Sequence, residues 1–85
     1  VLDVAAPREI EDRIRTVAMA IGGVLGVDLV RARRSGLVFL VDIHVEVDPE
    51  LSVRTGHRIA HDVKDALINS DLPILDALVH VEPKS

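Results

Sequence analysis

The sequence contains no cysteine, tryptophan or tyrosine, and Phe39 is its only phenylalanine. Without cysteine, the chain can form neither disulfides nor a thiolate metal site. With almost no aromatic side chains, it offers no platform on which nucleic-acid bases or sugars would stack. Hydrophobic residues still make up 48% of the chain and are almost all aliphatic, which suits a core of strands packed against helices.

Positive charge is also scarce. Ten Lys and Arg residues stand against 14 Asp and Glu, which gives a formal net charge of −4 and argues against a nucleic-acid partner. The densest basic stretch, residues 31–34, is interpreted as the solvated end of a strand. No apolar run approaches the ~20 residues that span a bilayer, so we expect no direct membrane insertion by this segment.

The chain has 85 residues, enough for a single domain over residues 1–85 and too few for two cores. It begins Val1-Leu2-Asp3 without an initiator Met, so we expect it to be a fragment of a longer protein.

Hydrophobic periodicity predicts five elements. Helical spacing follows Pro7 and ends at Gly22-Gly23, and a second helical stripe follows Ser52, a good capping residue. Alternating or continuous apolar runs mark three strands. The predicted order is helix 7–21, strands 24–33 and 37–47 joined by a tight turn at 34–36, helix 52–70 and strand 75–82. This is an α+β fold, αββαβ, with a three-stranded sheet, two helices on one face and the other face open.

The open face of this sheet is expected to carry titratable side chains. Strand alternation places Val41, Ile43 and Val45 toward the helices, so His44 lies on the open face, and by the same argument so do His80 and Glu82. Asp28 in the first strand and Asp42 in the second are in reach of these groups by pattern.

His57 and His61 lie one turn apart on the second helix. Imidazoles and carboxylates without thiolates are ligand chemistry for Zn²⁺ and for harder ions such as Mn²⁺ or Fe²⁺. An isolated exposed histidine is more commonly an ordinary surface residue. His44 together with His80 and Glu82 therefore carries the metal-site hypothesis.

Several motifs, taken together and in order, resemble the C-terminal cytoplasmic domain of the cation diffusion facilitators, which are divalent-metal/proton antiporters. The resemblance extends from about Leu2 to Pro83. Its segments are Arg31-Ala32-Arg33-Arg34-Ser35-Gly36, Val41-Asp42-Ile43-His44-Val45-Glu46-Val47-Asp48, Leu51-Ser52 leading to Gly56-His57, and Val79-His80-Val81-Glu82-Pro83.

The resemblance implies a ferredoxin-like, metallochaperone-like domain that forms a V-shaped homodimer and follows a transmembrane domain of six helices. Metal bound at the dimer interface would favour the closed, active transporter, so the domain would sense metal and catalyse nothing. It would lie on the cytoplasmic side of a cell (inner) membrane or of a magnetosome-like membrane, since iron-handling magnetosome transporters belong to the family.

The ligands implied by the resemblance are His44, His57, His80 and Glu82. A first-strand ligand depends on the alignment. Counting back from Arg31-x-Arg33 places Asp28 where many zinc exporters have His, whereas matching on Asp28-Leu29 places Val27 there and leaves no ligand. Either way one nitrogen is lost, which weakens the case for strong Zn²⁺ binding and raises Mn²⁺ or Fe²⁺ as the cargo. The expected cofactor is a divalent cation, Zn²⁺, with Mn²⁺ or Fe²⁺ as alternatives.

Three other functions compete with metal sensing. One is a purely structural dimerisation domain with a degraded metal site, and another is a stand-alone metallochaperone-like domain. An acylphosphatase-like hydrolase is disfavoured, because its anion-cradling loop should open a helix, whereas Gly22-Gly23 follows one.

Overall fold

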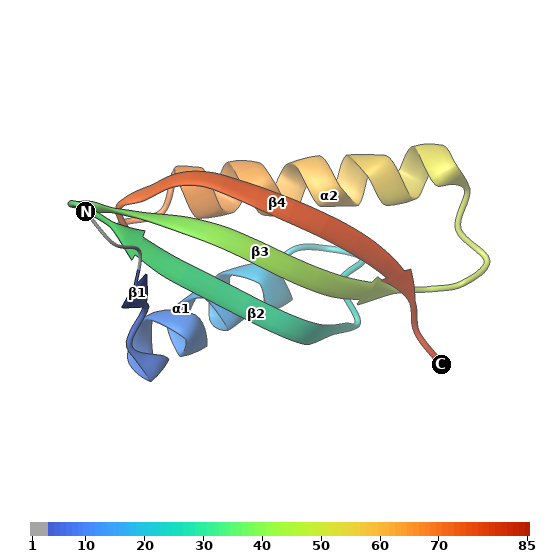
Figure 1. Cartoon of the computed structure of the whole chain (residues 1–85). Helices are drawn as coiled ribbons and strands as arrows, with labels where there is room; N and C mark the ends of the chain where they lie inside the picture. Colours follow the sequence, from blue (N-terminus) through green and yellow to red (C-terminus); the bar gives the residue numbers. More distant parts are fainter. Residues whose placement is uncertain (1–3) are drawn as a thin grey trace.

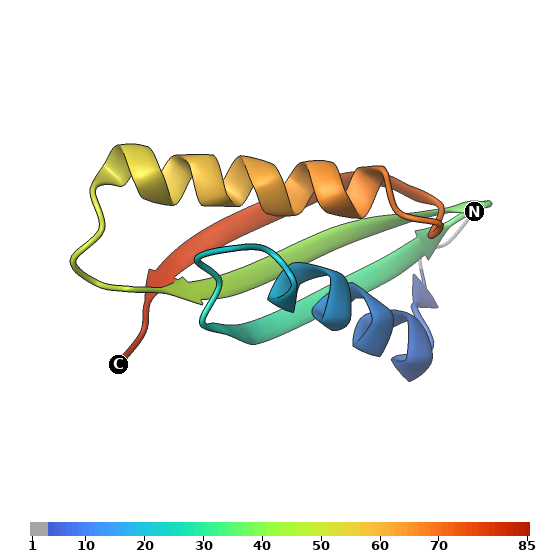
Figure 2. The same ribbon diagram turned by 180° about the vertical axis from the view of Figure 1, so that it is seen from behind.

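Two helices cover one face of a four-stranded sheet in the computed structural model, which describes residues 4–85 (Figure 1 and Figure 2). The α+β class and the αββαβ order are confirmed, but the count of three strands is wrong, because a two-residue strand precedes the first helix. Val1-Leu2-Asp3, on which the fragment expectation rests, lies outside the described residues. The elements are β1 (Val4–Ala5), α1 (Arg8–Met19), β2 (Gly26–Ser35), β3 (Val38–Val47), α2 (Val53–Ile68) and β4 (Ile74–Pro83).

The extra strand pairs only with the far end of β2, through Val4 with Arg34 and Ala5 with Arg33. Two residues are too few to show any alternation, so no sequence pattern could have indicated this strand.

The strand order β1-β2-β3-β4 places the two histidine-bearing strands side by side. β1 with β2 and β2 with β3 are antiparallel, while β3 and β4 are parallel and joined through α2. A parallel pair needs a crossover of this kind. In the resulting register His44 is paired with His80 and Glu46 with Glu82.

The connection between β2 and β3 is a two-residue hairpin loop. Ser35 pairs with Val38, which leaves Gly36 and Leu37 in the loop, one position beyond the predicted turn. Gly36 has a φ of +64°, a conformation in which a residue without Cβ is favoured.

The core lies between the sheet and the helices and is aliphatic apart from Phe39. In β3 every second residue is buried, while Asp42, His44 and Glu46 alternate with them on the opposite, open face. This confirms the predicted alternation. The buried residues are Ala6, Ile14, Ala18, Val24, Val30, Ala32, Phe39, Val41, Ile43, Val45, Val47, Ile59, Val63, Leu67, Leu72, Ile74 and Ala77.

The predicted cap of the second helix is also present. The Ser52 hydroxyl accepts a hydrogen bond from the Thr55 backbone N–H at 3.1 Å, which satisfies one of the free donors of the first turn. This cap fixes the start of α2 just before His57.

Candidate metal centre

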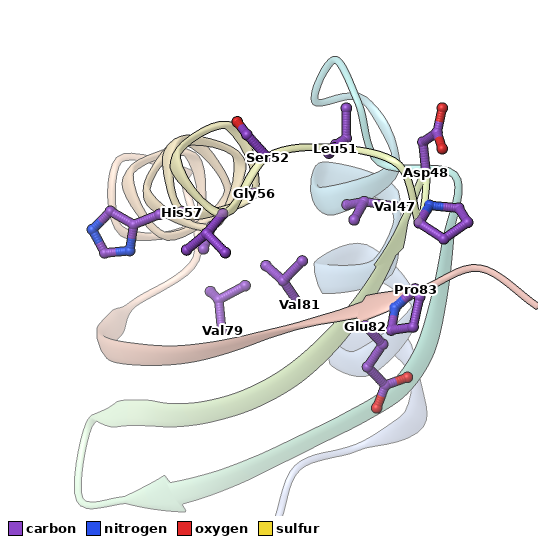
Figure 3. A pocket seen from close by; sticks show the side chains of 13 residues that line it. Val47, Asp48, Leu51, Ser52, Gly56, His57, Val79, Val81, Glu82 and Pro83 are labelled. Atoms are coloured by element: carbon purple, nitrogen blue, oxygen red, sulfur yellow. The ribbon is translucent and has the colours of Figure 1, made fainter.

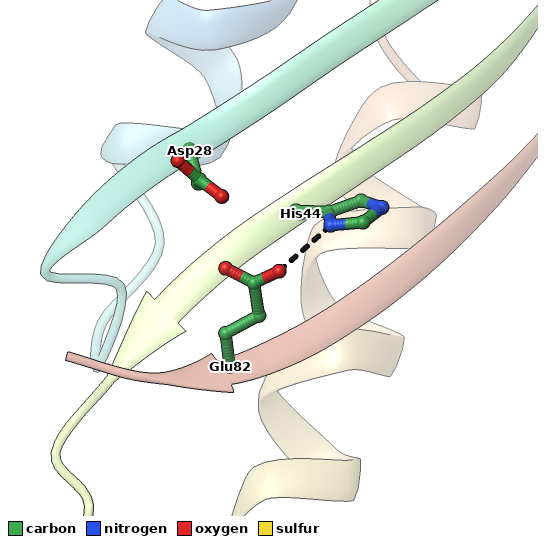
Figure 4. Close-up of side chains that lie close together, drawn as sticks. All are labelled: Asp28, His44 and Glu82. Carbon is green, nitrogen blue, oxygen red and sulfur yellow. Dashed lines mark hydrogen bonds and ion pairs between the residues drawn. The ribbon is translucent and has the colours of Figure 1, made fainter. Parts of the chain in front are cut away.

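Three strands bring Asp28, His44 and Glu82 together on the open face of the sheet (Figure 4). His44 Nδ1 lies 2.8 Å from Glu82 Oε2, a hydrogen-bond distance. One nitrogen or oxygen of each of the three side chains lies within 4.8 Å of the others. Among the described residues, this group is where two carboxylates and an imidazole could hold one ion.

Asp28 reaches the group because β2 contains a β-bulge. Val27 pairs with Val45 and Leu29 pairs with His44, so Asp28 is the extra residue between them. Simple alternation would put Asp28 in phase with Val30 and Ala32, which are buried under the helices. A bulge shifts this phase and can redirect a side chain. In Figure 4 the Asp28 carboxylate points toward His44 and Glu82.

The spacing of the three donors is close to what an ion requires. Two atoms that bind the same ion, each at ~2.1 Å from it, cannot lie more than ~4.2 Å apart. Small rotations of the two acidic side chains would bring the three atoms within binding distance of one ion. Both side chains have room to rotate, because Asp28 is exposed and the Glu82 side chain is 33% exposed. The His44 side chain, at 27% exposure, is the least exposed of the three.

Glu46 lies beside the group but has a different partner. It is paired with Glu82 in the strand register, and its Oε1 lies 3.5 Å from Lys84 Nζ. The lysine offsets the Glu46 charge, so the negative charge near His44 comes mainly from Asp28 and Glu82.

His80 and Asp42 lie on the predicted face at different places. The His80 ring packs against the His44 ring, with centroids 4.4 Å apart and planes tilted by 40°. His80 therefore flanks the three-residue group. Asp42 is paired with Arg31 on one side and Leu78 on the other, two residues before His44 in β3, and does not belong to the group.

His57 and His61 lie apart from the other two histidines. They are exposed on α2, with their Nε2 atoms 3.1 Å apart. Figure 3 shows His57 beside α2, on the helix side of β4, whereas the Glu82 side chain points to the opposite side of that strand. Within one chain, the structure does not bring His57 together with His44, His80 and Glu82.

An open groove of about 540 Å³ separates the first half of α2 from the end of β4 (Figure 3). Its lining is mostly apolar and includes Leu51, Val53, Val79 and Val81, with His57 among the lining residues. Val53 is 91% exposed. A single exposed aliphatic residue is ordinary, but several gathered along one groove are typical of surfaces that contact another protein.

Neither helix in the described part of the chain is long and apolar enough to cross a membrane.

The chain is similar to a cation-efflux pump, to a metal tolerance protein and to solved domains. It is 34% identical over 84 residues to the cation-efflux pump FieF of Pectobacterium atrosepticum, a match that covers 99% of this chain and 28% of that protein. It is 28% identical over 82 residues to metal tolerance protein C1 of Arabidopsis thaliana, covering 96% of this chain and 17% of that protein. The chain thus spans less than a third of the length of either relative.

Two solved structures share the fold closely. A histidine-to-alanine variant of MamM-CTD matches with a TM-score of 0.88 and 31% identity, covering 92% of this chain and 98% of that one. A nickel form of a glutamate-to-histidine variant of MamM-CTD matches with a TM-score of 0.89 and 29% identity, covering 93% and 100%. Residues 6–84 match the family "Cation efflux protein, cytoplasmic domain". The chain therefore belongs to the cytoplasmic domains of the cation efflux proteins, the cation diffusion facilitator family that its motifs resemble.

Proposed function

We propose that this domain senses a divalent cation for a cation/proton antiporter, through a site formed by Asp28, His44 and Glu82. The observation that carries the proposal is the convergence of their donor atoms within 4.8 Å from three different strands. Two carboxylates and one imidazole suit Zn²⁺ and also the harder ions Mn²⁺ and Fe²⁺. His80, in contact with the His44 ring, is placed to contribute a further nitrogen or to orient His44.

The bound ion would act through charge. Without it, the carboxylates of Asp28 and Glu82 repel each other near the surface, and a divalent cation removes that repulsion. In a homodimer, two such sites would influence how closely the two open faces approach. A ligand favours one arrangement only by binding it more tightly, so the closed dimer must complete the coordination shell better than the open one.

We further propose that residues 1–85 act as one regulatory domain attached to a transmembrane domain, on the cytoplasmic side of the membrane that holds it. Family membership supports this arrangement, as does the modest share of each relative's length that the chain covers. The apolar groove between α2 and β4 supports a protein–protein contact, and a second copy of the chain is the partner we propose.

Calorimetric titration of the chain with Zn²⁺, Mn²⁺ and Fe²⁺ tests the proposal, together with light scattering. We expect a dimeric mass and saturable binding that His44→Ala weakens at least tenfold, the loss of ~1.4 kcal/mol or more. Asp42→Ala, on the same face but outside the group, should bind as tightly as the unmodified protein.

A dimer that binds none of the three ions would favour the structural dimerisation domain instead. One observation also fits that alternative, because His44 and Glu82 can satisfy each other's hydrogen-bonding capacity within the chain. A monomeric mass at ~100 µM protein would contradict the proposed homodimer, because a dimer with a Kd of ~10 µM would hold about 80% of the chains at that concentration.

A further inference from the structure

The hairpin between β2 and β3 ends in an exposed apolar tip. Leu37, in its two-residue loop, is 93% exposed. β1 and the start of β4 lie at the same end of the sheet (Figure 1). They add Val4 and Leu75, which are 54% and 64% exposed. Three exposed aliphatic side chains therefore lie at this end.

Arginines flank the tip on both faces of the hairpin. Arg33 is paired with Leu40 on the open face, whereas Arg34 is paired with the buried Phe39 on the face that packs against the helices. The Arg34 guanidinium lies 5.3 Å from the centre of the Phe39 ring, a cation–π contact that holds it near the loop. Both arginines are exposed, and within residues 4–85 neither is in an ion pair.

The charges of the sheet are separated along its strands. The arginines of β2 all lie in its second half, toward the loop, whereas Asp28, Glu46 and Glu82 lie toward the opposite end. Asp28 and Arg34 are ~20 Å apart along the strand, more than twice the Debye length of ~8 Å at physiological salt. The chain therefore presents a basic end despite its net charge of −4.

We propose that this tip, formed by Arg33, Arg34 and Leu37, contacts the anionic phospholipids of the membrane to which the domain is attached. Guanidinium groups bind phosphates well, and an exposed aliphatic side chain is stabilised by leaving water at the headgroup layer. Arg34 lies up to ~10 Å from Leu37 along the strand, and apolar surfaces sink ~5–10 Å into this layer. The arginines would thus lie at the level of the phosphates. Only the Leu37 side chain enters the layer, so no segment of the chain crosses the bilayer.

The inference rests on the proposed attachment to a transmembrane domain, which would keep the tip close to a bilayer. A contact that is tethered needs little affinity of its own, because the tether raises the local concentration of its partner. Val4 is paired with Arg34, so a transmembrane domain attached before Val4 would connect beside the tip. The group around His44 would then face away from the bilayer.

The test attaches the chain to vesicles through an added N-terminal cysteine coupled to a maleimide lipid. The chain has no other cysteine and no tryptophan, so Leu37→Trp places a single fluorescent reporter at the tip. On vesicles of phosphatidylglycerol and phosphatidylcholine, the tryptophan emission should lie at shorter wavelength than on pure phosphatidylcholine. Brominated lipids should quench it on the anionic vesicles only.

Val53→Trp is the matched control for the reporter. Val53 is 91% exposed at the start of α2, at the opposite end of the sheet (Figure 1). Its emission should be the same on both kinds of vesicle. Shifts of equal size at the two positions would show adsorption without orientation and would overturn the proposal.

Arg33→Gln combined with Arg34→Gln tests the phosphate contacts. One arginine near an anionic surface contributes about fivefold in binding, so the ratio of inserted to exposed tryptophan should fall at least fivefold. Arg54→Gln combined with Arg58→Gln makes the same change of charge on the first half of α2 and should leave this ratio within about twofold. An equal fall in both double variants would mean that net charge alone governs the contact, and would overturn the proposal.

Two further results would also overturn it. One is emission from Leu37→Trp that is the same on both kinds of vesicle, which would leave a protein surface as the partner of the tip. The other is a dimeric mass that Leu37→Ser reduces to a monomeric one, which would make the tip a contact with a second copy. Neither result bears on metal sensing, because Zn²⁺ binding is measured separately and Leu37→Ser should leave it unchanged. A chain that binds no metal would contradict the sensing function alone.

Discussion

His44 and Glu82 contact each other diagonally across two parallel strands. His44 is paired with His80 and Glu82 with Glu46, yet His44 Nδ1 lies 2.8 Å from Glu82 Oε2. A glutamate side chain two positions further along the neighbouring strand is thus long enough to reach back to the imidazole. At the proposed metal site, this contact would hold both ligand side chains in place and so reduce the ordering needed to bind an ion.

Glu82→Gln tests whether the charge of this residue or only its hydrogen bond matters. Glutamine keeps the shape and can still bond to His44, but it lacks the negative charge that a divalent cation needs. We expect Zn²⁺ and Mn²⁺ affinity measured by calorimetry to fall at least tenfold, with little change in the melting temperature of the metal-free protein.

Glu46→Gln is the matched control for this variant. Glu46 is paired with Glu82 in the register but lies near Lys84, so its loss should leave metal affinity within about threefold, less than ~0.7 kcal/mol. If Glu82→Gln instead leaves affinity intact and lowers the melting temperature, the His44–Glu82 contact is structural.

Asp28→His should change the preference among ions. It replaces one of the two carboxylates with an imidazole at the bulge position, and nitrogen donors favour Zn²⁺ over Mn²⁺. We expect the ratio of Zn²⁺ to Mn²⁺ affinity to rise at least tenfold, measured by competition titration. Asp42→His adds an imidazole to the same face outside the group and should leave the ratio unchanged. An equal change in both variants would show that the preference among ions does not depend on a ligand at position 28.

Strand alternation was sufficient to predict which side chains share the open face, because a period of two leaves little choice once Val41, Ile43 and Val45 are buried. The same pattern named Asp28 as in reach of these groups, but its phase was wrong, because Val30 and Ala32 are buried under the helices. Asp28 reaches the open face through the bulge, which breaks the period and leaves no mark in the apolar pattern. The alignment that placed Asp28 at the ligand position and the one that placed Val27 there were equally compatible with the sequence.

Only the structure shows that the four histidines form two separate pairs, His44 with His80 and His57 with His61. The sequence indicates that His57 and His61 lie one turn apart, but not that α2 packs along β4 and so places His57 on the side away from Glu82. That arrangement depends on the parallel pairing of β3 with β4, which is a long-range contact. The contact of His80 with His44 depends on the same register.

Gly23→Ala should destabilise the fold. Gly23 has a φ of +94°, which residues with a Cβ rarely adopt, and an added Cβ would lie 2.6 Å from Ile59 Cδ1. Ile59 is buried in the core and has little room to move. We expect the free energy of unfolding to fall by ~1–3 kcal/mol, measured by urea denaturation.

Gly22→Ala is the neighbouring control, because its added Cβ would meet nothing within 4 Å and Gly22 has no positive φ. Its free energy of unfolding should stay within ~0.5 kcal/mol of the unmodified value. Equal losses at both positions would show that the end of α1, and not the contact with Ile59, limits stability.

Metal binding should compact the proposed homodimer, and mild acid should abolish the effect. A metal binds only neutral imidazole and releases protons when it does so, so Zn²⁺ binding at an imidazole-containing site should weaken as the pH falls from about 8 to about 5. Small-angle scattering with saturating Zn²⁺ at the higher pH should therefore give a smaller radius of gyration than the metal-free protein, with no difference at the lower pH. His44→Ala should remove the compaction at the higher pH. Metal binding without any change in dimensions at the higher pH would separate binding from closure, and the domain would then not act as a conformational sensor.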